Sequence, residues 1–379
     1  MGPTLPPAEL EIAIVGAGAS GLAAGAALEQ LGHAPVLLER DAQVGQRWAR
    51  RYDRLRLHTV RRYSGLPYHG LSRDQPRYVP KDAFAAYLRD YAARLELDVR
   101  LSATVERLSP RHGGWLVETP ATAYSVRAVV VATGRYNEPF TPPWPGSDGY
   151  RGQLLHSVDY RSGRAFAGQR VLVVGLGNTG AEIAADLVEQ GADRVAVAVR
   201  TPPPIVRREI LGVPVQLFGI ALSPFPAGPA DRLAAAMRRV GTGDLRQYGI
   251  GHAAWGPFTA RRPAVIDVGF LKELKAGAID VRGNVERLTE GGVVFAGGHE
   301  EPFDAVVAAT GFRQGLERFL DMPDAVDEHG DPRRFENGAG VAPGLFFCGY
   351  TETIRGQLLE ARREAPKIAG AVSRYLRAA

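Results

Sequence analysis

Two glycine-rich turns of the form Gly-x-Gly-x-x-Gly carry the clearest chemical signal in the sequence. Each has its glycines at the same three places, in chain order Gly16, Gly18 and Gly21, then Gly175, Gly177 and Gly180. In such a turn the first glycine allows a tight bend, the second lets the backbone approach a pyrophosphate, and the third lets helix and strand pack closely. Two such turns predict two dinucleotide sites, and the simplest chemistry between two dinucleotides is hydride transfer.

The residues around the first turn favour FAD. An apolar strand pattern over residues 11–15 precedes the turn, and an apolar helical face over residues 22–31 follows it. A second strand pattern, residues 35–38, ends in Glu39, where a carboxylate can bind a ribose diol and repels a 2′-phosphate. We therefore expect FAD at this turn, with Ser20 and Glu39 among its contacts.

The second turn repeats this plan but favours NADPH. Its second strand pattern, residues 195–199, ends in Arg200 instead of an acid. Arginine presents a planar fork to phosphate, so Arg200 is predicted to hold a 2′-phosphate; the alternative is a solvated arginine at a strand end. Asn178 and Thr179, inside the turn, are expected to help fix the phosphates, and helix capping is compatible with that role.

Two further strand patterns share an Ala-Thr-Gly ending, which places Thr133 and Gly134 after one strand and Thr310 and Gly311 after the other. Small residues there let the chain pass close to a nucleotide or cross between domains. The sequence thus predicts an α/β fold of two Rossmann-like dinucleotide-binding domains, the NADP domain inserted into the FAD domain. The expected boundaries are 1–160 and 300–379 for the discontinuous FAD domain and 161–299 for the NADP domain.

The NADP domain is expected to contain a Pro- and Gly-rich insertion over residues 201–264. Within it, residues 231–240 have the apolar spacing of an amphipathic helix, which we expect to pack against the protein. A C-terminal helix over residues 358–376 is expected to cover the first domain, with a kink or break at Pro366.

Composition restricts the class of protein. Of 379 residues, 45% are hydrophobic and 23% charged, as in globular proteins. One cysteine, Cys348, excludes a dithiol reductase mechanism within the chain and is expected in the core. The net charge of +5 is spread along the chain, so no nucleic-acid partner is expected. The sequence contains no run of 18 apolar residues, so no membrane span is expected, and residues 1–10 lack a signal-peptide pattern. We therefore expect a cytoplasmic protein. A homodimer is left open.

Between the two turns, residues 150–160 contain Tyr150, Gly152, His156 and Tyr160 at the spacing of a known fingerprint. This stretch resembles the class B flavin-dependent monooxygenases, and Tyr160 at its end resembles the flavin-containing rather than the Baeyer–Villiger branch. Further blocks are similar, in order, to YUCCA-type indole-3-pyruvate monooxygenases: residues 52–58, 78–81, 206–209, 265–269 and 349–351.

The resemblance implies a reaction cycle. NADPH would reduce FAD, dioxygen would add to the reduced flavin to give a C4a-(hydro)peroxyflavin, and bound NADP would shield it. The partners would be dioxygen and a small organic substrate, with oxidative decarboxylation of an aromatic 2-oxo acid as one outcome. N- or S-oxygenation, an uncoupled NADPH oxidase and a flavoprotein sensor stay open as alternatives.

The resemblance also implies roles for particular residues. His156 would act catalytically near the NADP site, and a capping or structural histidine is the alternative. Trp48 would border the flavin, and Thr351 and Gln357 would lie near the flavin ring, with contacts through backbone groups. A 2-oxo acid would need a cation for its carboxylate, for which the candidates are Arg207 and Arg208.

Overall fold

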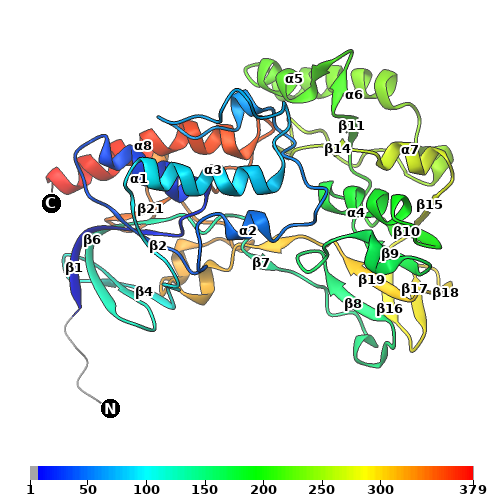
Figure 1. Ribbon diagram of the computed structural model, residues 1–379, viewed down its shortest axis with the longest axis horizontal. Coiled ribbons are helices and arrows are strands. Elements are labelled where there is room, and N and C mark those ends of the chain that lie inside the picture. Colours follow the sequence, from blue (N-terminus) through cyan, green and yellow to red (C-terminus); the bar gives the residue numbers. More distant parts are fainter. Residues whose placement is uncertain (1–6, 379) are drawn as a thin grey trace.

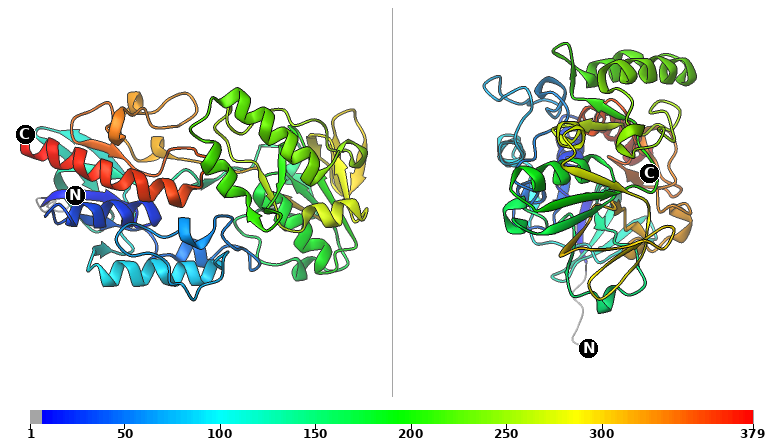
Figure 2. Two further views of the ribbon diagram at one scale, coloured as in Figure 1. Left: turned by 90° about the horizontal axis from the view of Figure 1, so that it is seen from above. Right: turned by 90° about the vertical axis from the view of Figure 1, so that its right-hand side faces the viewer.

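The computed structural model describes residues 7–378, so most of the first ten residues, where a signal-peptide pattern is lacking, lie outside it. Two sheets form two lobes that lie end to end (Figures 1 and 2). The first sheet has, in spatial order, β3 (Asp98–Arg100), β2 (Val36–Leu38), β1 (Ala8–Val15), β6 (Ala123–Val131), β5 (Gly114–Glu118) and β4 (Arg107–Arg111), with β21 (Leu345–Phe347) also paired to β6. The order of the second is β15 (Ile279–Arg282), β10 (Arg194–Ala198), β9 (Arg170–Val174), β19 (Ala305–Ala308) and β8 (Gln153–His156).

The core strands of the first sheet bury both faces, as parallel strands do. One face, with Ile12 and Ile14, packs against α1 (Ala19–Glu29), α3 (Lys81–Arg94) and α8 (Gln357–Ala378). The other face, with Ala13 and Val15, packs against β5 and the segment around Leu316. Alternate residues of one strand thus face opposite layers, which fixes the strand register and the position of the turn that follows β1.

The second sheet is built in the same way. Val171 and Val173 face α4 (Asn178–Glu189) and α7 (Phe270–Lys275), whereas Leu172 and Val174 face the other side. That side is covered by a small antiparallel sheet of β16 (Val285–Leu288), β17 (Gly292–Phe295) and β18 (Glu300–Pro302). Together the two lobes confirm the predicted fold class of two Rossmann-like units.

The chain crosses between the lobes twice, and the crossings lie side by side. β7 (Glu138–Pro139) leaves the first lobe and pairs antiparallel with β20 (Phe312–Arg313), which returns to it. The predicted boundaries at 161 and 299 need correction, because β8 and β19 both pair within the second sheet. Strand pairing therefore assigns residues 153–308 to the second sheet and its connections.

The insertion forms its own small structure along one side of the second lobe, with α5 on the side toward the first lobe (Figure 1). β11 (Ile205–Arg207) pairs with β14 (Val265–Asp267). Along the chain, the elements between these two strands include β12 (Glu209–Ile210), β13 (Val213–Pro214), α5 (Val215–Leu222) and α6 (Ala227–Thr242). The predicted amphipathic helix is confirmed as part of α6. The expected packing is observed in part: α6 contacts β11 and buries Ala230 and Thr242, whereas Leu233 is 49% and Val240 90% exposed.

The C-terminal helix α8 continues as one helix through Pro366, so of the predicted kink or break the break is wrong. Its apolar face, which includes Ile368 and Val372, is fully buried against α1 and the first sheet. Burial on this scale outweighs the single backbone hydrogen bond that the proline removes. No helix in residues 7–378 is long and apolar enough to cross a membrane.

Candidate functional site

The first glycine turn has the geometry that a pyrophosphate needs. Gly16 adopts φ +99°, a conformation that side chains disfavour, and a Cβ on Gly21 would stand 1.9 Å from the carbonyl oxygen of Gly16. A Cβ on Gly18, in contrast, would meet no atom within 4 Å. The open approach at Gly18, next to the N-terminus of α1, fits a dinucleotide phosphate. Ser20 lies in the first turn of that helix, half-buried.

The second turn has nearly the same dimensions. Gly175 adopts φ +104°, and a Cβ on Gly180 would stand 2.0 Å from the oxygen of Gly175, while Gly177 again has open space. The side-chain oxygen of Asn178 accepts a hydrogen bond from the backbone N–H of Ile266 (2.7 Å). That contact ties α4 to β14 and engages the oxygen of the Asn178 amide, and the phosphate contact of Asn178 stays a prediction. Thr179 follows it in the first turn of α4.

The carboxylate of Glu39 is held at the first turn. It accepts hydrogen bonds from the backbone N–H groups of Ala17 (2.7 Å) and Asp41 (3.0 Å). The carboxylate is therefore oriented next to the turn before any ribose binds, which reduces the ordering cost of binding.

Both Ala-Thr-Gly strand ends lie against the turn of their own sheet. A Cβ on Gly16 would stand 3.0 Å from the oxygen of Ala132, and one on Gly175 would stand 2.6 Å from that of Ala309. The hydroxyl groups of both threonines make hydrogen bonds. That of Thr133 bonds to the hydroxyl of Tyr350 (2.6 Å), and that of Thr310 donates to the carbonyl of Phe140. Gly134 and Gly311, at φ +82° and +90°, then turn the chain away.

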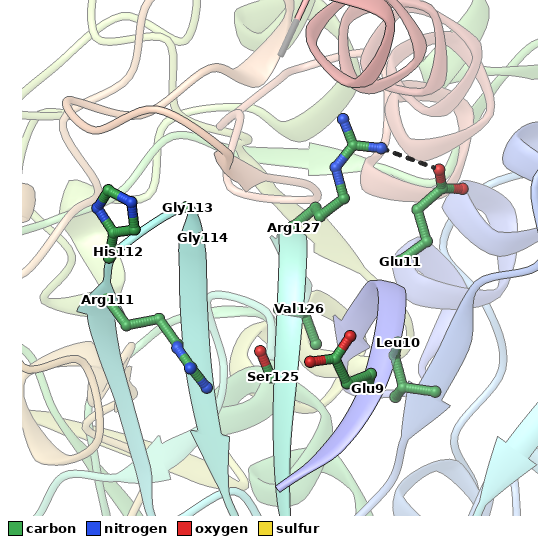
Figure 3. Close-up of a pocket in the computed structure, with 10 residues that line it drawn as sticks. All are labelled: Glu9, Leu10, Glu11, Arg111, His112, Gly113, Gly114, Ser125, Val126 and Arg127. Atoms are coloured by element: carbon green, nitrogen blue, oxygen red, sulfur yellow. Dashed lines mark hydrogen bonds and ion pairs between the residues drawn. The ribbon is translucent and has the colours of Figure 1, made fainter.

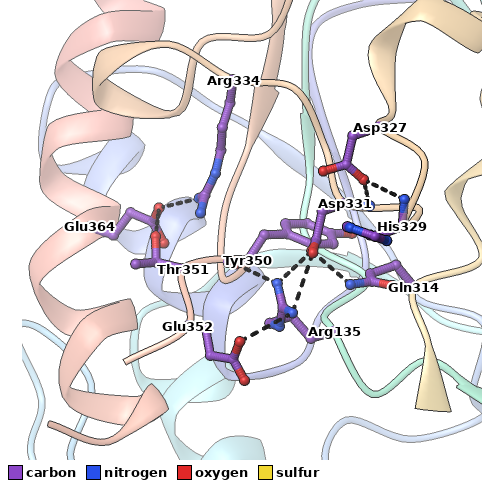
Figure 4. Close-up of polar contacts among 10 residues, drawn as sticks. All are labelled: Arg135, Gln314, Asp327, His329, Asp331, Arg334, Tyr350, Thr351, Glu352 and Glu364. Carbon is purple, nitrogen blue, oxygen red and sulfur yellow. Dashed lines mark hydrogen bonds and ion pairs between the residues drawn. The ribbon is translucent and has the colours of Figure 1, made fainter. Parts of the chain in front are cut away.

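The predicted flavin-ring residues lie around the N-terminus of α8. The hydroxyl of Thr351 donates to Glu364 (3.0 Å), which also accepts from Arg334 and from the N–H of Gly349 (Figure 4). The hydroxyl proton of Thr351 is thus already used within the protein, which is compatible with the predicted backbone contacts to a flavin. The side-chain nitrogen of Gln357 is buried and has no hydrogen-bond partner among the described residues, which fits a group that donates to a bound cofactor.

Trp48 has a packing role in the structure, and its place beside the flavin stays a prediction. It lies in α2 (Gln46–Ala49) and meets the ring of Phe84 edge to face at 4.7 Å. Because Trp48 is only partly buried, one side of the indole stays accessible to a ligand.

A polar network that the sequence did not reveal braces the same region (Figure 4). Arg135 donates to Asp331 (2.5 Å) and to the carbonyl of Tyr350 (3.0 Å), and its guanidinium lies 3.7 Å from Glu352. Gln314 donates to the same oxygen of Asp331 (2.7 Å). The segment after β6 and the turn after β21 are held together by these contacts. No motif marks these residues, and only the charge of Arg135, next to Gly134, could have suggested a role.

His156, the predicted catalytic residue, has both ring nitrogens engaged. Its Nδ1 accepts from the N–H of Val158 (3.1 Å), so Nε2 carries the proton and donates to the carbonyl of Gly311 (3.0 Å). Burial lowers the pKa of His156 and favours this neutral form. The geometry supports a positioning role at the crossing between lobes, and the catalytic role stays a prediction.

The rest of the fingerprint builds the second sheet and its links. The hydroxyl of Tyr150 donates to the carbonyl of Phe303 (2.9 Å), and that of Tyr160 donates to Asp186 (2.7 Å) on α4. A Cβ on Gly152 would collide with the ring of Tyr150. The residues between them form β8, the edge strand of the sheet.

A buried carboxylate joins the two lobes. Glu182, on α4, is 1% exposed and pairs with His58, which belongs to the first lobe. Burial, and then the neighbouring Glu182 carboxylate, raises the pKa of Tyr52 well above its ordinary value. Nothing in the sequence distinguishes a buried helical glutamate such as Glu182 from a solvated one.

Arg200 lies just beyond the end of β10, exposed to solvent. Its role toward a 2′-phosphate stays a prediction. We expect Arg200→Ala to raise the KM for NADPH about 10- to 100-fold, because a charge-assisted contact with phosphate is lost, and to change the KM for NADH less than about twofold. Steady-state kinetics with both coenzymes would measure this, and equal changes would reject the assignment.

An open hollow of about 320 Å³ lies elsewhere, between β1, β6 and the β4–β5 turn (Figure 3). Its lining includes Glu9, Glu11 and Arg127, near the start of β1. Ligands of parallel α/β sheets bind beyond the carboxyl ends of the strands, where Gly16 lies. The hollow is therefore separate from the nucleotide sites.

Comparison with known proteins agrees with this geometry. The family described as pyridine nucleotide-disulphide oxidoreductase matches residues 13–208. Indole-3-pyruvate monooxygenase YUCCA1 of Oryza sativa subsp. japonica is 37% identical over 353 residues, which cover 89% of this chain and 86% of that protein. Indole-3-pyruvate monooxygenase YUCCA6 of Arabidopsis thaliana is 35% identical over 374 residues, which cover 94% and 89%.

Solved structures show the same fold. The flavin-containing monooxygenase from Stenotrophomonas maltophilia superposes with a TM-score of 0.77 at 23% identity and covers 97% of this chain and 99% of that one. Bacillithiol disulfide reductase from Bacillus cereus gives a TM-score of 0.71 at 18% identity, with coverage of 97% and 99%.

Two glycine turns, each open only where a pyrophosphate would approach, fit two dinucleotides, and the similarity to the YUCCA proteins extends over most of the chain. The chain therefore belongs to the YUCCA-type flavin-dependent monooxygenases, and FAD and NADPH are its cofactors.

Proposed function

We propose that the protein catalyses the oxidative decarboxylation of an aromatic 2-oxo acid. In this reaction the 2-oxo acid, dioxygen, NADPH and a proton give a carboxylic acid one carbon shorter, carbon dioxide, water and NADP⁺. One oxygen atom of dioxygen enters the new carboxyl group and the other leaves as water.

One observation carries this proposal: relatives named as indole-3-pyruvate monooxygenases are similar over nearly the whole chain, at 37% and 35% identity. The similarity includes the segments that join the lobes, with residues 52–58 and 265–269. In the structure these two segments meet, since Arg54 donates to the carbonyl of Val268 (3.0 Å). They form the joint where two dinucleotides on facing sheets would bring their rings together.

Bound FAD would supply the hydride acceptor and the oxygen chemistry. The chain's own part is binding, orientation and exclusion of water. The turns at Gly18 and Gly177 would hold the two pyrophosphates, and Gln357 would donate a hydrogen bond from its buried amide. Arg135 and Glu364 hold the turn before α8 in place, and His156 fixes the crossing segments next to Gly311. These site assignments stay proposals.

Product analysis tests the proposal. Purified holoenzyme, NADPH and indole-3-pyruvate labelled at the carboxyl carbon should release one labelled carbon dioxide for each NADPH consumed. Amines and sulfides serve as competing substrates in parallel reactions. Retention of the label together with oxygenation of an amine or sulfide would favour the N- or S-oxygenating alternative. NADPH consumption that no substrate changes would favour an uncoupled oxidase.

The cytoplasmic location, the lack of a nucleic-acid or membrane partner and the question of a homodimer stay as predictions from the sequence.

A further inference from the structure

A partly buried cation, with no ion-pair partner among the described residues, lies where the two lobes and the insertion meet. Arg208 follows β11, and its guanidinium stacks on the ring of Tyr78, with the central carbon 3.6 Å from the ring centroid. One terminal nitrogen donates to the carbonyl of Leu57, whereas Nε is buried without a hydrogen-bond partner among the described residues. A guanidinium has five N–H donors, and to leave one buried and unpaired is costly.

The neighbouring carboxylates are already engaged. Glu209 accepts from the hydroxyl of Tyr78 (2.9 Å) and from Arg77 (2.9 Å). Glu182 pairs with His58. Within residues 7–378, no carboxylate lies within ion-pair distance of Arg208. Burial lowers the pKa of Arg208, because a charge removed from water is costly, and an anion from outside the chain would offset that cost.

The position of Arg208 connects it with the predicted flavin-ring residues. The carbonyl of Leu57 accepts a hydrogen bond from Arg208. The residues that follow Leu57 contact the insertion and the residues just before α8. Gln216 of α5 accepts from the N–H of Val60 (2.9 Å) and donates to the carbonyl of Arg355 (2.7 Å). Gly356, next in the chain, packs against Thr59, where a Cβ would come within 2.5 Å of the methyl group. Gln357 follows directly.

We propose that Arg208 is the residue that binds the substrate carboxylate and so selects 2-oxo acids. The planar fork of arginine matches a carboxylate, and its stacking on Tyr78 holds the guanidinium in one orientation. Of the two arginines that the sequence offered, only Arg208 meets these conditions, since Arg207 is exposed. This inference rests on the proposed function, because it names the group that recognises its substrate.

The test measures binding without turnover. Oxidised holoenzyme is titrated with indole-3-propionate, an unreactive carboxylate, and with its methyl ester, and the change in flavin absorbance gives both dissociation constants. Arg208→Gln should weaken binding of the acid about 10- to 100-fold and that of the ester less than about twofold. Arg207→Gln, a neighbouring exposed arginine, is the matched control and should change neither constant more than about twofold.

Flavin content and thermal unfolding show whether each variant is folded. If Arg208→Gln loses its flavin, Arg208→Lys is used in its place, because lysine keeps the charge but lacks the planar fork. Arg208→Lys should weaken binding of the acid more than binding of the ester. Equal losses for acid and ester, or an unchanged affinity for the acid, would overturn the inference. If Arg208 fails this test but the wild type still releases labelled carbon dioxide, only the role of Arg208 is rejected and the proposed function stands. If the wild type neither releases labelled carbon dioxide nor binds the acid, the role of Arg208 and the proposed function are both rejected.

Discussion

Replacing Gly180 by alanine is expected to slow the reduction of the flavin by NADPH on the order of 100-fold while FAD stays bound. The new Cβ would stand 2.0 Å from the carbonyl oxygen of Gly175, so α4 must shift away from β9. A displacement of about 1 Å is enough to cost two orders of magnitude when two groups must meet in a defined geometry. Stopped-flow absorbance of the flavin after mixing with NADPH measures the rate, and the flavin spectrum measures FAD content.

Two other glycines provide controls for this result. A Cβ at position 177 would have no atom within 4 Å, so Gly177→Ala should leave thermal unfolding unchanged. It should raise the KM for NADPH, because the new methyl group lies where the pyrophosphate would approach. Gly228→Ala, in α6, also has free space and should change neither property. Reduction of Gly180→Ala at the wild-type rate would show that NADPH binds elsewhere.

Glu182→Ala is expected to lower the free energy of unfolding by about 3 kcal/mol. The substitution removes the buried acceptor of His58, which lies on the other lobe, and leaves a space beside Tyr52. Urea unfolding followed by circular dichroism measures the change. Because the Glu182–His58 pair joins the two lobes, the first lobe, with the flavin site, and the second lobe should unfold less cooperatively in this variant.

Glu189→Ala is the matched control, since Glu189 lies further along the same helix. Its ion pair with Arg54 (3.2 Å) is partly exposed, with 40% of the glutamate side chain accessible. Such pairs contribute less than about 1 kcal/mol. If the two variants lost the same stability, the buried joint between the lobes would have no special role.

The sequence was sufficient to predict the elements that repeat. Strand, turn and helix around Gly16 and Gly175 have strong local signals, because a buried strand, a required glycine conformation and a helical apolar face coincide within about 20 residues. The predicted boundaries between the lobes were less accurate for a physical reason. Ala-Thr-Gly follows β19 as it follows β6, because each lies against the glycine turn of its own sheet, so this pattern does not show to which lobe a strand belongs.

The site was only partly predictable. Glycines and Glu39 were found because their chemistry depends on spacing along the chain. The relation of Arg208 to Tyr78, and of Glu182 to His58, depends on contacts between segments far apart in sequence. For a single arginine or glutamate, the sequence does not reveal whether its partners are protein groups, water or a ligand.

The pairing of β21 with β6 has a consequence for biosynthesis. Leu345 lies beside Val129, so the ribosome must add another 216 residues before the central strand of the first sheet gains this neighbour. Residues 153–308, which form the second sheet, emerge earlier and can fold as one continuous unit. Until α8 arrives, the nascent chain exposes the apolar surface of α1, the state in which it is most dependent on chaperones. We therefore expect FAD to bind after α8 has been synthesised.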